Sequence, residues 1–142
     1  MKLENKVAIV TGGSRGIGYA TVEKFIKEGA KVCLTASSEA SAEKAVGKLK
    51  EAYPNADIMG IAPTLSSLES VQAEFAKVVE KYGRIDILIN NAGMSESTPL
   101  SAYTEELYDK VIDLNVKGVF TCSKVAADYM EKQHSGVIIN AS

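Results

Sequence analysis

Short apolar runs alternate with longer segments of helical periodicity along this chain of 142 residues. The apolar runs lie at residues 7–10, 32–35, 58–61, 85–89 and 137–139. Between them, apolar side chains recur every three or four residues, as at Val71, Phe75 and Val78. Strands that are apolar on both faces and separated by helices are typical of a parallel sheet with right-handed crossovers. The sequence therefore predicts a doubly wound, Rossmann-like α/β fold with five strands.

Length and composition indicate one domain, which we place at residues 1–142. Hydrophobic residues make up 46% of the chain and charged residues 24%, close to ordinary globular domains, so a disordered or collagen-like chain is disfavoured. A buried parallel strand is normally followed by a helix that covers it. Because the fifth apolar run ends just before Ser142, we expect the domain to be incomplete at its carboxyl end, with later strands and helices missing.

The charge balance favours a small-molecule partner. The chain has 16 Lys and Arg against 18 Asp and Glu, a net charge of −2, and therefore lacks the basic surplus that nucleic acids or acidic membranes attract. The longest uncharged run, residues 58–68, is too short to cross a bilayer, and we predict no membrane partner. Cys33 and Cys122 lie in apolar segments without metal-ligand spacing, so we expect no metal site, reduced core thiols and a cytoplasmic location.

Helix boundaries are marked by polar residues and glycines. Ser66-Ser67-Leu68-Glu69 has the pattern of a capping box at the start of the third helix. Gly29 and Gly83 stand where the first and third helices should end. The fourth helical region, residues 104–132, is unusually long, and we expect it to be bent in its middle.

A glycine-rich segment, Thr11-Gly12-Gly13-Ser14-Arg15-Gly16-Ile17-Gly18, directly follows the first strand and opens the first helix. Glycine allows a tight turn and lets a pyrophosphate approach the backbone, and the helix N-terminus offers free N–H groups to phosphate. A compact turn in a domain without ligand is the alternative interpretation. We predict cofactor contacts at Gly12, Ser14, Arg15, Gly16, Ile17 and Gly18.

Taken with three later motifs, this turn resembles the short-chain dehydrogenase/reductase family along the whole chain. The motifs are Asn90-Asn91-Ala92-Gly93 after the fourth strand, Asn115-Val116-Lys117-Gly118-Val119-Phe120, and Gly136–Ser142. The resemblance implies that the glycine turn holds the pyrophosphate of a dinucleotide and that Asn91, Ala92 and Gly93 lie along the adenosine ribose. Asn90 and Asn91 also suit turn chemistry at a strand end, and both interpretations can hold together.

Residues after the second strand favour NADP(H) over NAD. A carboxylate there accepts hydrogen bonds from an unmodified ribose and repels a 2′-phosphate. By family register that carboxylate would stand at Ala36, where it is missing. Arg15, with the hydroxyls of Ser37 and Ser38, could instead pair with the extra phosphate. The alternative for Arg15 is an exposed cation on a loop.

Thr64 and Leu65, just after the third strand, are assigned to the cofactor site by the same resemblance. The family usually has Asp or Asn at the position of Thr64, where it bonds the adenine amino group. A threonine hydroxyl should weaken that contact by about 1 kcal/mol.

Asn115 is the catalytic residue that the resemblance places within this chain. The family's reaction transfers a hydride from the nicotinamide while a tyrosine, assisted by a lysine, gives a proton; a serine orients the substrate and the asparagine holds a water. A polar residue on a solvated helix face is the alternative for Asn115. By register the catalytic serine follows Ser142 and the Tyr-x-x-x-Lys segment lies further on, so we expect the 142-residue chain to be inactive alone.

The predicted activity is interconversion of a ketone and a secondary alcohol by an NADP(H)-dependent oxidoreductase. The chain looks most like the 3-oxoacyl-acyl-carrier-protein reductases of fatty acid biosynthesis, and a rival resemblance at residues 53–63 is to bile-acid hydroxysteroid dehydrogenases. A different class is a truncated, inactive fragment that binds nucleotide. We expect the fragment to self-associate through the uncovered edge of the strand at residues 137–139, and residues 104–132, which resemble the family's subunit-contact helix, should add to that surface. The full-length form is expected to be a homodimer or homotetramer.

Overall fold

Five short strands pair in parallel in the order β3-β2-β1-β4-β5 in the computed structural model, which describes residues 1–142. The strands are β1 (Val7–Val10), β2 (Lys31–Thr35), β3 (Ile58–Ile61), β4 (Ile87–Asn90) and β5 (Val137–Asn140). The α-helices are α1 (Gly16–Lys27), α2 (Glu39–Ala52), α3 (Leu68–Tyr82), α4 (Glu105–Ile112) and α5 (Gly118–Gln133), with a 3₁₀ turn η1 (Leu100–Ala102) and a π-helical turn η2 (Asp113–Lys117). The Rossmann-like α/β fold predicted from the alternation of segments is confirmed.

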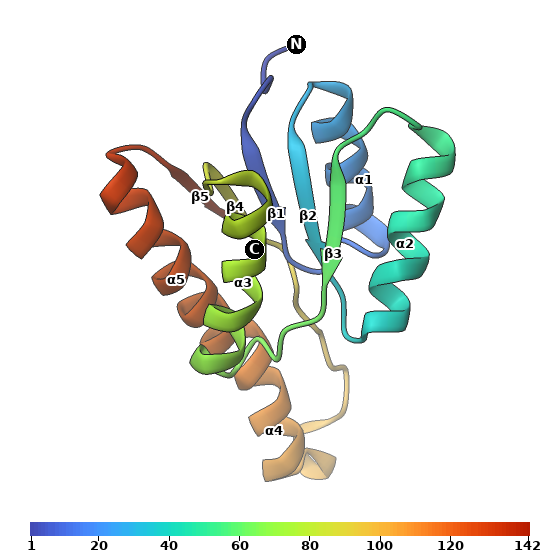
Figure 1. Cartoon of the computed structure of the whole chain (residues 1–142). Helices are drawn as coiled ribbons and strands as arrows, with labels where there is room; N and C mark the ends of the chain where they lie inside the picture. The colour runs from blue at the N-terminus through green and yellow to red at the C-terminus, as the bar shows by residue number, and fades with distance from the viewer.

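Helices cover both faces of the sheet, with α1 and α2 on one side and α3 and α5 on the other (Figure 1). The first core layer includes Val22, Ala42 and Leu49 of α1 and α2, packed near Val10, Val32 and Leu34 of the sheet. The second layer includes Val71, Phe75 and Val78 of α3 with Cys122, Val125 and Met130 of α5. This arrangement explains why β1 and β2 are buried along nearly their whole length and carry no alternating polar residues.

The two cysteines are free and fully buried, as predicted for core thiols. Burial raises the pKa of Cys122 to about 12 and raises the pKa of Cys33 further, because a thiolate would lose its solvation there. Both side chains are therefore neutral thiols near pH 7 and act as small apolar groups.

The start of α3 differs by one residue from the predicted capping box. Ser67, rather than Ser66, is the N-cap, and its Oγ accepts a hydrogen bond from the N–H of Ser70 at 3.2 Å. The Ser67 N–H donates to the Thr64 carbonyl at 2.9 Å, so a turn in the preceding loop sets the boundary. The predicted ends at Gly29 and Gly83 are confirmed, because both glycines have positive φ, +89° and +84°.

Two further boundaries refine the predictions. The fourth strand begins at Ile87 rather than residue 85, because the Ile85 N–H is bonded to the side chain of Gln133 at 3.1 Å. The distortion expected in the long helical region is the π-helical turn η2 between α4 and α5.

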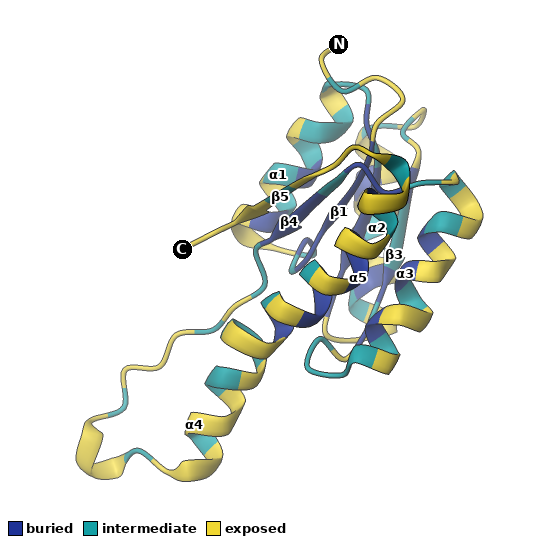
Figure 2. Ribbon diagram, turned by 90° about the vertical axis from the view of Figure 1, so that its left-hand side faces the viewer, coloured by how far each residue is buried: buried dark blue, intermediate teal, exposed yellow.

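Helix α4 projects from the body and is largely exposed (Figure 2). No helix combines the length and apolar character needed to cross a membrane.

Thr11, at the end of β1, joins the two halves of the sheet. Its side chain is buried, and its Oγ1 accepts hydrogen bonds from the N–H groups of Asn91 and Ala92, both at 3.0 Å. The hydroxyl is also within 3.4 Å of the Ile89 carbonyl oxygen, to which it can donate. One hydroxyl therefore fixes the segment after β4 against the glycine turn.

We predict that Thr11→Val lowers the free energy of unfolding by about 2 kcal/mol, because the Ala92 N–H loses its acceptor and the Asn91 N–H keeps only the Ile89 carbonyl. Thr11→Ser keeps the oxygen and should cost much less. Urea denaturation followed by circular dichroism measures both. Equal stability of the valine and serine variants would contradict the role given to the hydroxyl.

Candidate functional site

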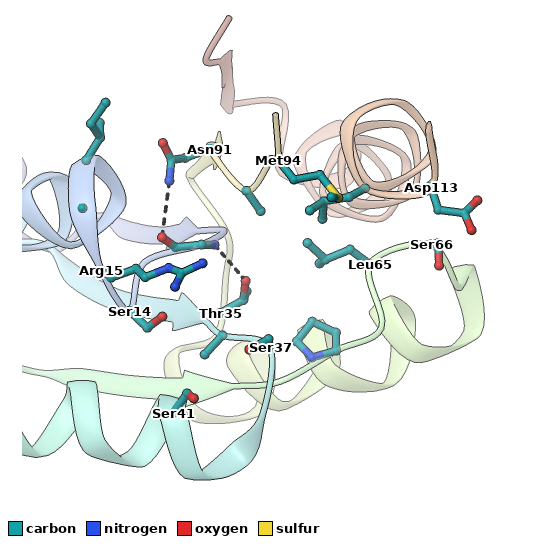
Figure 3. A pocket seen from close by; sticks show the side chains of 18 of the residues that line it. Ser14, Arg15, Thr35, Ser37, Ser41, Leu65, Ser66, Asn91, Met94 and Asp113 are labelled. Atoms are coloured by element: carbon teal, nitrogen blue, oxygen red, sulfur yellow. Dashed lines mark hydrogen bonds between the residues drawn. The ribbon is translucent and has the colours of Figure 1, made fainter. Parts of the chain in front are cut away.

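A cavity of about 840 Å³ opens at the carboxyl ends of β1 to β4 (Figure 3). The chain connections leave β1 and β4 toward opposite faces of the sheet, so a crevice forms where the strand order reverses. The walls come from the glycine turn, the ends of β2 and β3, the segment after β4, and the junction of α4 with η2. This is the position where open α/β sheets bind their ligands.

Ten of the thirteen residues predicted to contact a cofactor line this cavity. They are Gly12, Ser14, Arg15, Gly16, Ile17, Ser37, Leu65, Asn91, Ala92 and Gly93. Gly18, Ser38 and Thr64 lie outside the lining, as does the predicted catalytic residue Asn115. Nine lining residues were not predicted to contact a cofactor: Thr35, Ala36, Ser41, Pro63, Ser66, Met94, Lys110, Asp113 and Leu114.

The glycine turn approaches the segment after β4 closely. Gly12 has a φ of +65°, and a Cβ there would lie 2.9 Å from the Cα of Ala92. Gly16 also has a positive φ, +59°, but a Cβ there would meet nothing within 4 Å. A Cβ at Gly18 would overlap the carbonyl oxygen of Gly12, which explains why Gly18 lies behind the cavity wall. Gly12 and Gly18 therefore shape the turn, while the backbone at Gly16 faces open space.

The N-terminus of α1 has no side-chain cap. Arg15 is the N-cap residue, its side chain accepts no hydrogen bond, and the first turn contains no acidic residue. The corresponding ends of α2, α3 and α4 are capped by Ser38, Ser67 and Thr104. Since Gly16 and Ile17 line the cavity, the free N–H groups and partial positive charge of α1 can serve an anion there.

Thr35 was not among the predicted site residues, yet it holds the glycine turn in place. Its buried Oγ1 accepts from the Gly12 N–H at 3.1 Å, and its carbonyl accepts from the Gly13 N–H at 3.0 Å. Thr11 supports the same turn from β1. Polar, β-branched residues at the carboxyl ends of two apolar strands were the signal in the sequence that could have indicated both roles.

One side of the cavity is cationic and rich in hydroxyls. Figure 3 draws Ser14, Arg15, Ser37 and Ser41 on one side, with Leu65 across from them. Arg15 is exposed and forms no ion pair. The only carboxylate in the lining belongs to Asp113, on the α4–η2 side. This part of the site can therefore bind a phosphate group without a neighbouring carboxylate to repel it.

Ser38 does not line the cavity because its hydroxyl caps α2. The Oγ accepts from the Ser41 N–H at 3.1 Å and lies 2.9 Å from the Ser41 Oγ. Ser41 lines the cavity instead. The α2 N-terminus thus presents Ser37 and Ser41 to the site.

Thr64 is exposed and lies outside the cavity lining. Its backbone N–H donates to Ser70 Oγ at 2.9 Å, so the residue belongs to the turn that leads into α3. The neighbours Leu65 and Ser66 form this part of the wall. The structure thus brings an aliphatic side chain, rather than Thr64, to the end of β3.

Asn115 lies in the π-helical turn and is not on a solvated face. Its Nδ2 donates to the Met94 carbonyl at 2.7 Å, and its Oδ1 accepts from the Met94 N–H at 2.9 Å. A Cβ at Gly93 would lie 3.0 Å from the same Oδ1. The amide therefore attaches η2 to the segment after β4, directly beside two residues of the lining.

The paired asparagines after β4 point to different partners. Asn90 is buried, and its Nδ2 donates to Ser123 Oγ at 3.0 Å and to Asn140 Oδ1 at 2.9 Å. Asn91 Nδ2 donates hydrogen bonds to the carbonyl oxygens of Thr11 and Gly12, at 3.2 Å and 3.3 Å. Asn90 therefore stabilises the β4–β5 pair against α5, whereas Asn91 stabilises the glycine turn and lines the cavity.

Comparison with known proteins agrees with this geometry. The family model for short chain dehydrogenase matches residues 6–142. The chain is 50% identical over 142 residues to a 3alpha-hydroxysteroid dehydrogenase of Mediterraneibacter gnavus, and 39% identical over 142 residues to the 3-oxoacyl-[acyl-carrier-protein] reductase FabG of Thermotoga maritima. In both cases the whole chain matches 57% of the relative, so it spans little more than half of their length.

Solved structures of other proteins also resemble this chain along nearly its whole length. Levodione reductase superposes with a TM-score of 0.90 at 32% identity, covering 97% of this chain and 54% of that one. The crystal structure of gox2181 superposes with a TM-score of 0.93 at 34% identity, covering 99% and 55% of the two chains. Because the family model spans all but the first five residues, and the fold and crevice agree with it, the chain belongs to the short-chain dehydrogenase family.

Proposed function

We propose that this chain is the nucleotide-binding part of an NADP(H)-dependent oxidoreductase that interconverts a ketone and a secondary alcohol. The observation that carries the proposal is the uncapped N-terminus of α1, which meets the glycine turn and the unpaired Arg15 at one cavity. Two phosphate-binding features therefore lie together in the crevice of a doubly wound sheet.

The residues present fit a dinucleotide. The open backbone at Gly16 and the first turn of α1 suit the pyrophosphate, and Asn91, Ala92 and Gly93 suit the adenosine ribose. Leu65 offers an aliphatic wall for the adenine. A cavity of about 840 Å³ lies within the range of pockets that hold small molecules and cofactors.

The preference for NADP(H) rests on charge. Ala36 occupies the strand end where a carboxylate would repel a 2′-phosphate, and its side chain is buried and apolar. Arg15 can form a charge-assisted, bidentate interaction with that phosphate, and Ser37 and Ser41 can donate hydroxyl hydrogen bonds. NAD lacks the 2′-phosphate that this side of the cavity is suited to bind.

The bound nicotinamide would supply the hydride. The residues of this chain bind and orient the dinucleotide, and we assign Asn115 to the proton relay because it lies beside Gly93 and Met94 of the cavity wall. None of Tyr103, Tyr108 and Tyr129 has a lysine four residues later, and so none fits the proton donor.

For the substrate, the first candidate is a hydroxysteroid or the corresponding ketosteroid. The 50% identity to the 3alpha-hydroxysteroid dehydrogenase over the whole chain favours it over the acyl-carrier-protein substrate that the motifs alone suggested. A 3-oxoacyl thioester is the second candidate, supported by 39% identity to the Thermotoga maritima reductase.

Self-association is proposed through the face formed by α4, η2 and α5. Val116 and Phe120 are 57% and 61% exposed there, and Tyr108 of α4 is also exposed. An apolar face of this kind is typical of an interface between subunits. We therefore assign it to a homodimer or homotetramer contact of the protein.

We predict that the 142-residue chain binds NADPH more tightly than NADH in fluorescence titrations. Arg15→Ala should weaken NADPH binding about tenfold, through loss of a charge-assisted contact, and leave NADH nearly unchanged. Lys44→Ala, which removes an exposed lysine of α2 outside the cavity, is the matched control. Identical curves for both cofactors in wild type and variant would overturn the assignment.

We predict no reduction of a 3-ketosteroid or a 3-oxoacyl thioester by the 142-residue chain with NADPH. General acid–base catalysis contributes about 10²- to 10⁴-fold, and no Tyr-x-x-x-Lys pair exists in the sequence to provide it. The assay follows NADPH absorbance. Turnover by a preparation free of other reductases would show that the register of the catalytic residues is wrong.

Self-association should depend on the apolar face. We expect the weight-average sedimentation coefficient to rise with protein concentration, and Phe120→Glu to reduce that rise because it places a charge within the face. Lys44→Glu adds negative charge elsewhere and should have little effect. A compact monomer at high concentration would contradict the proposed contact.

A further inference from the structure

The first turn of α5 contacts the cavity wall from behind at Leu65. The hydroxyl of Thr121, which is 1% exposed, donates a hydrogen bond to the Leu65 carbonyl, and the Gly118 carbonyl is a second acceptor within reach. A Cβ at Gly118 would lie 3.3 Å from the Cβ of Leu65. The loop and the helix are therefore in close contact at two points.

The other hydrogen bonds of the loop at residues 62–66 connect it only to the start of α3. Thr64 donates its N–H to Ser70 Oγ, and its carbonyl accepts from the Ser67 N–H, both at 2.9 Å. The pairing of β3 with β2 ends at Ile61. Thr121 thus makes the hydrogen bond that attaches the loop at residues 62–66 to the helix packed against it.

The same helical segment also carries the neighbouring part of the wall. Leu114 and Asp113 line the cavity from η2, which leads directly into α5. Figure 3 places Leu65 between Met94 and Ser66, with its side chain directed into the cavity. The separation of the Leu65 wall from the η2 wall is therefore set by the contact of Leu65 with Gly118 and Thr121.

We propose that Thr121 is a positioning residue for the adenine end of the cofactor, an inference that rests on the proposed function. Its hydroxyl fixes Leu65 so that a flat base can lie against an aliphatic wall at contact distance. Dispersion contacts weaken steeply when a gap of less than 1 Å opens, so a small displacement of Leu65 reduces affinity. Thr121 itself lies outside the cavity lining and acts only through Leu65.

The test compares Thr121→Val, which keeps the shape and removes the hydroxyl, with Thr121→Ser, which keeps the hydroxyl. Adenosine 2′,5′-bisphosphate is the probe for the adenine end, and reduced nicotinamide mononucleotide, which lacks adenosine, is the control ligand. We expect about fivefold weaker binding of the bisphosphate by the valine variant, near-complete rescue by serine, and no change for the mononucleotide. Gly118→Ala should act in the same direction as valine, because its methyl group displaces Leu65.

Hydrogen–deuterium exchange of the ligand-free protein provides a second measurement. The Thr64 and Ser67 amides should exchange faster in Thr121→Val than in Thr121→Ser or wild type, because the loop loses its attachment to α5. Failure of wild type to bind the bisphosphate would overturn the proposed function, and the exchange result would still decide whether Thr121 positions the loop. Equal exchange in all variants, or equal loss of affinity for both ligands, would overturn the inference about Thr121.

Discussion

The hydroxyl of Thr11 is the interaction on which the site depends most. A doubly wound sheet sends the connections after β1 and β4 to opposite faces, and the backbone pairing of these two strands ends at the hydrogen bond from the Thr11 N–H to the Ile89 carbonyl. The Thr11 hydroxyl connects the two walls because it accepts hydrogen bonds from the N–H groups of Asn91 and Ala92. The Asn91 amide returns two hydrogen bonds to the glycine turn, so both walls of the crevice are fixed before any ligand arrives.

Other side chains around the cavity hold neighbouring loops by hydrogen bonds in the same way. Thr35 holds the glycine turn from β2, Asn115 holds the segment after β4 from η2, and Thr121 holds the loop after β3 from α5. Each is a short polar side chain that bonds the backbone of a neighbouring loop. Loops at the end of a parallel sheet lose their strand pairing, and these bonds satisfy backbone groups that would otherwise be left unpaired near the core.

Much of this could be predicted from the sequence because it depends on local patterns. Buried parallel strands produce continuous apolar runs, and the run at 7–10 followed by glycines points to the proposed phosphate end of the site without knowledge of the rest. The capping of α3 was predicted one residue early because Ser66 and Ser67 both fit an N-cap, and only the turn at Thr64 decides between them. Ser38 was assigned to the cofactor for a similar reason, since a helix cap and a phosphate ligand require the same hydroxyl chemistry.

The role of Thr121 could not be inferred from spacing, because it depends on a contact between segments far apart in the sequence. Thr121 lies 56 positions from Leu65, and nothing near it in the chain indicates which carbonyl it will meet. Only the packing of α5 beside α3 brings the two together. The proposed phosphate end of the site is thus encoded locally in one turn and one helix N-terminus, whereas the proposed adenine end is assembled from β3, η2 and α5. Local encoding makes the first recognisable in a single sequence, and assembly from distant segments makes the second dependent on the fold being formed.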